Sequence, residues 1–88
     1  MKGFGPKNNF KESNKNSDFL ENDRLIINSL KLHSKGKISE AKSSYQDHIK
    51  NGISDPRVFT NLGVIFQSEN DYERAVKLYK KSIILFPE

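Results

Sequence analysis

The chain has 88 residues, of which 34% are hydrophobic and 30% are charged, and its formal net charge is +4. A chain of this length forms one small domain that buries only about 60% of its unfolded surface. The absence of cysteine excludes disulfides, thiolate catalysis and cysteine-based zinc sites. Basic residues are interleaved with Asp and Glu instead of being clustered, which argues against nucleic-acid binding.

Residues 1–19 are rich in Lys, Asn, Gly and Ser, and their apolar residues Phe4, Phe10 and Phe19 have neither helical nor strand spacing. Such a segment buries too little apolar surface to offset its ordering entropy, so we predict a disordered, polar and basic leader. The first ten residues lack the apolar run of a signal peptide, and no stretch approaches the length of a membrane span. We therefore expect a cytoplasmic protein without a membrane partner.

From Leu20 onward the apolar residues recur every three or four positions, which predicts an amphipathic helix that ends at the sequence "SKGK". Gly36 suits the left-handed backbone position that closes a helix. A second amphipathic segment follows from Ile38 to Ile49. The two segments predict a helix, a short turn and a helix.

The sequence "KNGISDPRVF" contains signals for both a helix end and a helix start. Gly52 marks the end, whereas Asp55 suits the N-cap of a third helix with Pro56 at its first position, running to about Ser68. A fourth helix, capped by Asp71, is expected over residues 72–85. No stretch shows sustained strand alternation, so the chain is predicted to be all-α.

The second helix pair repeats the residue types of the first at an offset of 34 positions. Small residues align with small and large with large: Leu25 with Phe59, Ser29 with Gly63, Leu32 with Phe66, Ala41 with Ala75, and Tyr45 with Tyr79. A helix-turn-helix unit with this period is typical of stacked helical repeats. We interpret the small residues as sites of close helix approach and the tyrosines as side chains that fill the space between units.

The second unit resembles the tetratricopeptide repeat family. The resemblance rests on residues in "PRVFTNLGVIFQSENDYERAVKLYKKSIILFP", namely Phe59, Leu62, Gly63, Phe66, Tyr72, Ala75, Tyr79 and Pro87. The first unit, over about residues 22–55, is degenerate, because it has Asn28 in place of Leu62, His48 in place of a small residue and no closing proline at Ile53. The resemblance implies a repeat domain over residues 20–88, with repeats at about 22–55 and 56–88, forming a fragment of a right-handed α-solenoid.

Proteins of this family usually hold peptides or partner surfaces in a concave groove lined by the first helix of each pair. By position, the resemblance assigns the groove to Asp23, Ile26, Leu30, His33, Arg57, Thr60, Asn61, Val64 and Gln67. Arg57 and Asn61 lie one helical turn apart and could hold a ligand carboxylate or backbone. Alternatively, Arg57 is a surface charge beside Asp55. Because Ile26 and Leu30 are apolar, the family's clamp for a terminal carboxylate is not expected.

No catalytic apparatus is visible in the sequence. There is no glycine-rich phosphate loop, no nucleophilic serine in a recognised context and no carboxylate pair in a recognisable cleft. His33 and His48 have no carboxylate or thiol at metal-ligand spacing, and His48 is interpreted as a structural substitution. We expect neither a metal site nor a cofactor.

The last predicted helix ends in "SIILFPE", where Ile83, Ile84, Leu85 and Phe86 follow one another, so some of them must face outward. We expect either a continuation of the protein or another chain to cover this surface. The leading hypothesis is a non-enzymatic module that binds a protein or peptide through the groove or through this apolar end. The alternatives are the N-terminal repeats of a larger enzyme, such as a glycosyl- or sulfotransferase, and a homodimer formed through residues 83–86.

Overall fold

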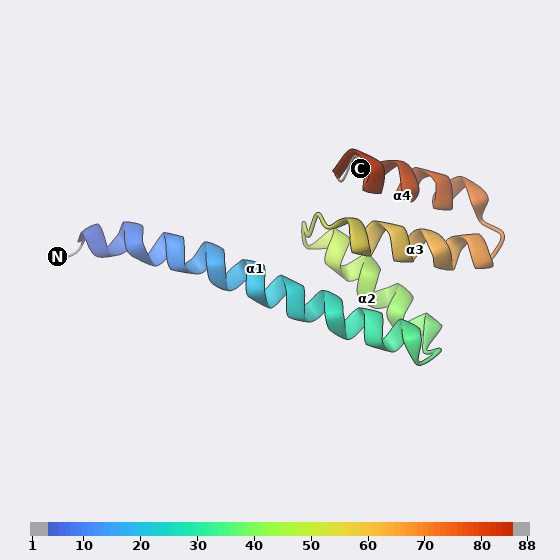
Figure 1. Ribbon diagram of the computed structural model, residues 1–88, viewed down its shortest axis with the longest axis horizontal. Coiled ribbons are helices and arrows are strands. Elements are labelled where there is room, and N and C mark those ends of the chain that lie inside the picture. The colour runs from blue at the N-terminus through green and yellow to red at the C-terminus, as the bar shows by residue number, and fades with distance from the viewer. Residues whose placement is uncertain (1–3, 86–88) are drawn as a thin grey trace.

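The computed structural model describes the backbone of residues 4–85 and the side chains of residues 18–85. Residues 4–85 are all-α, and their four helices are α1 (Phe4–Ser34), α2 (Ile38–Lys50), α3 (Pro56–Ser68) and α4 (Tyr72–Leu85). Each helix packs on the next, and α3 and α4 run side by side in opposite directions (Figure 1). The predicted bounds of the second, third and fourth helices are confirmed to within a residue.

The helix boundaries follow the local signals in the sequence. Gly36 has a φ of 79°, the left-handed conformation predicted for it, between α1 and α2. Asp55 is the N-cap of α3 and accepts a 2.9 Å hydrogen bond from the backbone N–H of Arg57, with Pro56 at the first position. Asp71 accepts a 3.3 Å bond from the N–H of Arg74 at the start of α4. Turn chemistry therefore sets where these helices begin and end.

The predicted disordered leader is not what the structure has, since α1 already begins at Phe4 and passes through the expected boundary at residues 19 and 20. Gly5 and Pro6 lie in the first turn, where the missing N–H of proline costs no helical hydrogen bond, and neither Gly nor Pro occurs between Pro6 and Gly36. Extending an existing helix adds one hydrogen bond for each residue that is fixed and needs no burial. The composition argument considered burial alone and was wrong for residues 4–19. Residues 1–3 lie outside the described chain.

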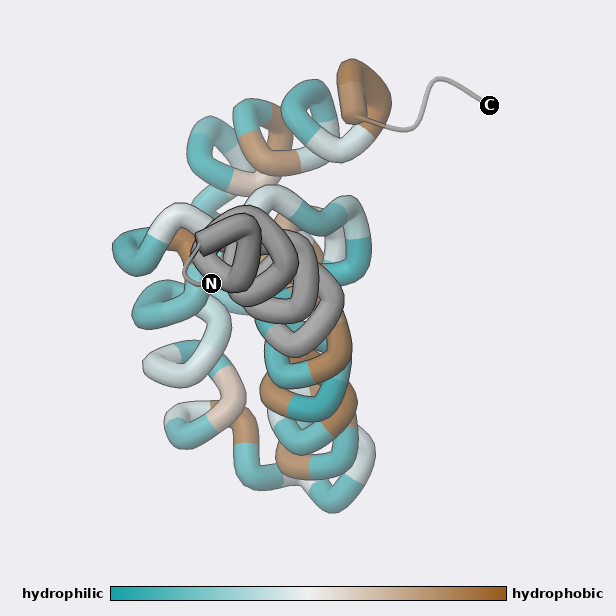
Figure 2. Tube along the Cα trace, turned by 90° about the vertical axis from the view of Figure 1, so that its left-hand side faces the viewer, coloured by the Kyte–Doolittle hydropathy of each residue, from teal (hydrophilic) through white to brown (hydrophobic). Residues whose placement is uncertain are grey.

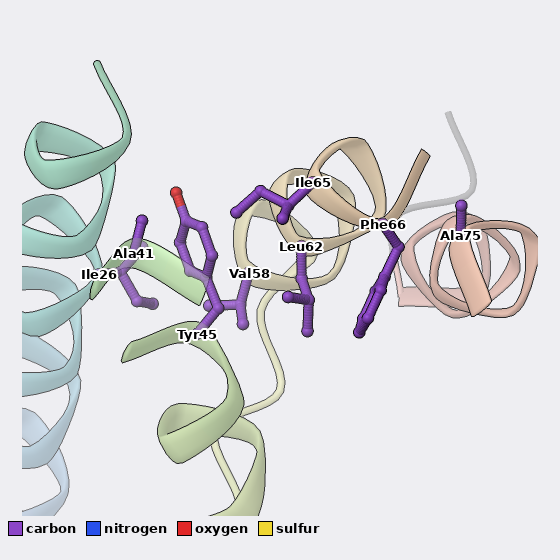
Figure 3. Packing of buried hydrophobic residues seen from close by; sticks show 8 residues of the cluster. All are labelled: Ile26, Ala41, Tyr45, Val58, Leu62, Ile65, Phe66 and Ala75. Carbon is purple, nitrogen blue, oxygen red and sulfur yellow. The ribbon is translucent and has the colours of Figure 1, made fainter. Parts of the chain in front are cut away.

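The hydrophobic core lies where α2 is covered by α1 on one side and by α3 on the other. Tyr45 of α2 is fully buried, and its ring points between Ile26 of α1 and Val58 and Ile65 of α3 (Figure 3). Ala41 beside it is also fully buried. The prediction that Ala41 and Tyr45 are a packing pair is confirmed.

Gly63 of α3 lies in close contact with the Tyr79 side chain of α4. A Cβ atom at Gly63 would lie 2.7 Å from Cε1 of Tyr79, a distance that real side chains do not tolerate. The predicted role of Gly63 in close helix approach is confirmed. Ser29, the corresponding residue of α1, is also completely buried, and its hydroxyl donates to the carbonyl of Leu25 at 3.2 Å.

Among the residues that the structure describes, no helix is both long and apolar enough to cross a membrane.

The Gly63 contact predicts that the effect of Gly63→Ala on stability depends on the Tyr79 side chain. Gly63→Ala should lower the free energy of unfolding by about 1–3 kcal/mol, because the new methyl group overlaps the Tyr79 ring. With Tyr79→Ala in the background, the same change should be neutral or stabilising, because alanine is about 1 kcal/mol better than glycine inside a helix. Urea unfolding followed by circular dichroism on the four chains measures both effects. If Gly63→Ala lowered the free energy of unfolding equally in the original chain and in the Tyr79→Ala chain, the proposed contact would be wrong.

Candidate partner-binding surfaces

The predicted groove residues of α1 divide between the surface and the core. Ile26 is only 1% exposed and belongs to the core beside Tyr45, and Leu30 packs partly buried against the same cluster. In this structure Ile26 is therefore a core residue and is not available to a partner. Asp23 stays partly exposed and forms an ion pair with Arg57.

Arg57 is the centre of an ion-pair group that joins three segments of the chain. Its Nε and Nη2 donate to the two carboxylate oxygens of Asp55 at 3.0 and 2.9 Å, and Nη2 lies 2.8 Å from Oδ1 of Asp23 in α1. The hydrogen bonds from the Arg57 side chain hold the pKa of Asp55 below its ordinary value, and the same bonds raise the pKa of Arg57. The Arg57 guanidinium, which was a candidate for holding a ligand, therefore already binds two carboxylates of the chain.

The other polar groove candidates of α3 also have partners within the chain. Asn61 Nδ2 donates to the carbonyl oxygen of Arg57 at 2.8 Å, so the pair of Arg57 and Asn61 is engaged locally. Thr60 Oγ1 lies 2.6 Å from the hydroxyl of Ser82 in α4. Val64 is 44% exposed and is the apolar groove candidate of α3 that stays open. The structure thus provides internal bonds where the sequence suggested ligand contacts.

The two tyrosines at equivalent positions make equivalent polar contacts. The hydroxyl of Tyr45 lies 3.1 Å from Nδ1 of His33, and that of Tyr79 donates to Oε1 of Gln67 at 2.7 Å. His33 and Gln67 are themselves 34 residues apart. Both predicted groove residues therefore hold a tyrosine from the following helix. Burial raises the pKa of Tyr45, since its phenolate would lose contact with water.

His48 is buried at the contact between α1 and α2, as expected for a structural residue. Its Nε2 lies 2.8 Å from the hydroxyl of Ser29 and 3.4 Å from that of Ser44. A serine beside a histidine suggests a nucleophile, but Ser29 is completely buried and closed to a substrate. Among the side chains that the structure describes, no three His, Asp or Glu residues gather in a group that could hold a metal ion.

Among the residues that the structure describes, α4 has more exposed large apolar side chains than any other helix. Ile83, Ile84 and Leu85 are 62%, 76% and 42% exposed, as predicted for the C-terminal face, and the last turn of α4 is strongly hydrophobic (Figure 2). Phe86 lies outside the described residues.

Two further apolar residues of α4 escaped the sequence reasoning, since Tyr72 and Val76 are 59% and 47% exposed. With the partly buried Tyr79 they continue toward Ile83 at steps of four, three and four residues. That spacing was visible in the sequence and could have identified them. We call Tyr72, Val76, Tyr79 and Ile83 the α4 stripe.

A second surface of α4 is basic. This helix has four basic residues and one acidic residue, Glu73, which gives it three of the net four positive charges of the chain. Three of the basic residues border a shallow groove over apolar residues of α3 and α4, and the lining consists of Leu62, Phe66, Arg74, Lys77, Leu78 and Lys81. We call it the α3–α4 basic groove.

Comparison with known proteins gives no relative: no family model matches the chain, and neither a curated protein nor a solved structure matches it.

The ion-pair group predicts a pH-dependent stability. The pKa of Asp55 in the folded chain is below its ordinary value of 3.8, so its contribution is present above that pH and is lost as the pH falls through the lower folded value. Asp55→Ala should lower the free energy of unfolding by about 1 kcal/mol at neutral pH through the lost N-cap. The difference from the original chain should be smaller at about pH 3, because below the ordinary pKa the unfolded chain takes up a proton more readily than the folded Asp55 carboxylate does.

The control is Asp47→Ala, which removes the same charge at an exposed position of α2. Urea unfolding at both pH values should give the original chain and the Asp47 variant the same pH dependence. A difference for Asp55→Ala that stays constant with pH would contradict the assignment.

Proposed function

We propose that the chain is a non-catalytic protein-interaction module, built from two repeats of the tetratricopeptide type, that binds a partner helix against the α4 stripe. The observation that supports this proposal is a comparison within the molecule. In α2 the corresponding residues from Lys42 to Ile49 are at least partly buried, whereas Tyr72, Val76 and Ile83 of the α4 stripe are exposed.

The two stripes are related residue by residue at the 34-residue offset. Tyr72, Val76, Tyr79 and Ile83 of α4 correspond to Ile38, Lys42, Tyr45 and Ile49 of α2. Tyr45 is fully buried and Ile49 is partly buried, whereas Tyr79 is partly exposed and Ile83 is 62% exposed. The open stripe is also more apolar, because Val76 replaces Lys42. Leaving these side chains in water costs about 25 cal/mol for each Å² of apolar surface that a partner would bury.

The helix that covers α2 indicates what kind of partner would cover α4. Of the buried cluster that contains Tyr45 of α2, α3 contributes Val58, Leu62 and Ile65, which follow one another at steps of four and three. These positions form a single apolar face of a helix. A partner helix with the same spacing fits the α4 stripe by the same packing of ridges into grooves.

At the opposite end of the molecule, the residues of α1 that correspond to Val58, Leu62 and Ile65 are Arg24, Asn28 and Lys31, and all three are exposed. The exposed apolar residues of α1, Phe19, Leu20 and Ile27, are at other positions of the helix. A second copy of the chain therefore does not offer, at these positions of α1, the apolar residues with which α3 covers α2. If the chain self-associates, the contact should join two α4 stripes about a twofold axis, which is the second candidate function.

The α4 stripe can be tested with a fluorescein-labelled peptide that contains residues 55–69 of this chain, because α3 already covers such a stripe. We expect the peptide to bind the full chain, and Val76→Glu to weaken binding by about tenfold or more, since a carboxylate would be buried in an apolar contact. Fluorescence anisotropy measures the affinity, and sedimentation velocity over a concentration series distinguishes a monomer from a dimer. Val76→Glu should also dissociate a dimer formed through the stripe.

Ile84→Glu is the matched control, because Ile84 is on the same helix and 76% exposed but lies outside the stripe. It should bind the peptide as the original chain does. Equal losses for both variants, or no binding to the original chain, would overturn the proposal. If Val76→Glu left the affinity for the peptide unchanged, the peptide would be displacing α3 from α2.

A further inference from the structure

The basic groove between α3 and α4 has the composition of a binding surface that is distinct from the α4 stripe. Leu62 and Phe66 point to the same side of α3 (Figure 3). Together with Leu78 of α4 they form the apolar floor of the groove. Arg74, Lys77 and Lys81 border this floor at steps of three and four residues along α4. The groove thus combines an apolar floor with a row of cations.

The cations at this groove have few partners within the chain. Arg74 forms one ion pair, with Asp71 at 3.5 Å, and its side chain is 68% exposed. Lys77 and Lys81 form no ion pair with the carboxylates that the structure describes, and both are exposed. Exposed like charges on one helix face repel one another, and a ligand with negative charges would relieve that repulsion.

The aromatic ring in the groove already contacts cationic side chains of the chain itself. Phe66 lies between two of them, with Lys42 Nζ at 4.8 Å and Arg74 Cζ at 5.5 Å from its ring centroid. Lys81 Nζ lies 5.7 Å from the centroid of Phe59, which is outside the groove lining. The apolar stems of these side chains cover the floor while their charged ends stay in water. A ligand can therefore contact the stems and rings with apolar groups and meet the charged ends with carboxylates.

We infer that the α3–α4 basic groove binds an acidic amphipathic helix from a partner protein. Carboxylates along one edge of that helix meet Arg74, Lys77 and Lys81, which span about 10 Å of α4 at 1.5 Å per residue. A helix with Asp or Glu at the same three- and four-residue steps matches this row. An apolar residue on its inner face packs over Leu78 and the Phe66 ring. The stripe residues Tyr72, Val76 and Ile83 are not part of this contact.

The test uses the full 88-residue chain and a fluorescein-labelled amphipathic peptide of about 18 residues, with leucines on one face and glutamates along its edges. We expect the double variant Lys77→Glu, Lys81→Glu to weaken binding by about tenfold or more. Lys80→Glu makes the same change of charge on the same helix outside the groove, and it should alter the affinity by less than about twofold. Circular dichroism verifies that the variants keep their helix content.

Two further measurements separate the groove from other surfaces and from general charge attraction. Val76→Glu should leave the affinity for the acidic peptide unchanged. The inference about the groove can therefore fail without the proposal about the α4 stripe failing, and the reverse. A peptide with glutamine in place of every glutamate should bind about tenfold more weakly or worse. In amide NMR spectra, shifts on peptide binding should concentrate on the residues of α3 and α4 that line the groove.

Several outcomes would overturn the inference. They are an equal loss for Lys80→Glu, an equal affinity for the glutamine peptide, and no binding of the acidic peptide by the original chain. Tighter binding of phosphatidylserine vesicles or of a polyuridine oligonucleotide than of the peptide, with the same dependence on Lys77 and Lys81, would assign the surface to a membrane or to RNA instead.

Discussion

The arrangement of the helices depends on the burial of Tyr45 between α1 and α3. Its ring fills the space between α1 and α3. Its hydroxyl contacts the partly buried side chain of His33. Close packing of a ring of this size requires small neighbours, and Ala41 is one turn away on the same helix. Because α2 is held on both sides through this residue, it fixes the position of the first helix pair relative to the second.

The helices could be predicted from the sequence to within a residue wherever a turn signal was present. Gly36 and Asp55 specify a local backbone conformation or a local hydrogen bond, so neighbouring residues suffice to interpret them. The extension of α1 to Phe4 could not be predicted by the same reasoning. That part of the helix depends on propagation from a packed region further along the chain.

The candidate site was less predictable, because side-chain partners come from distant parts of the sequence. Position within a repeat places Arg57, Asn61 and Gln67 on one face of α3, but it does not reveal that Asp23 of α1 binds Arg57 or that Tyr79 of α4 binds Gln67. The groove prediction could not tell which of its polar residues already have partners within the chain. The α4 stripe depends only on spacing within one helix, so it was within reach of the sequence.

The two candidate surfaces lie on different sides of the same helix, and α4 is also the least anchored element of the second pair. Ala75 is its one buried residue among those described, whereas α3 has six. Helices with few buried contacts open at a lower free energy than the rest of a structure, and a ligand that binds only the closed form stabilises it by mass action. A partner on either surface would therefore strengthen the packing of α4 on α3. Each partner would also favour binding of the other to the extent that α4 opens in the free chain, because the first to bind removes the cost of ordering the helix.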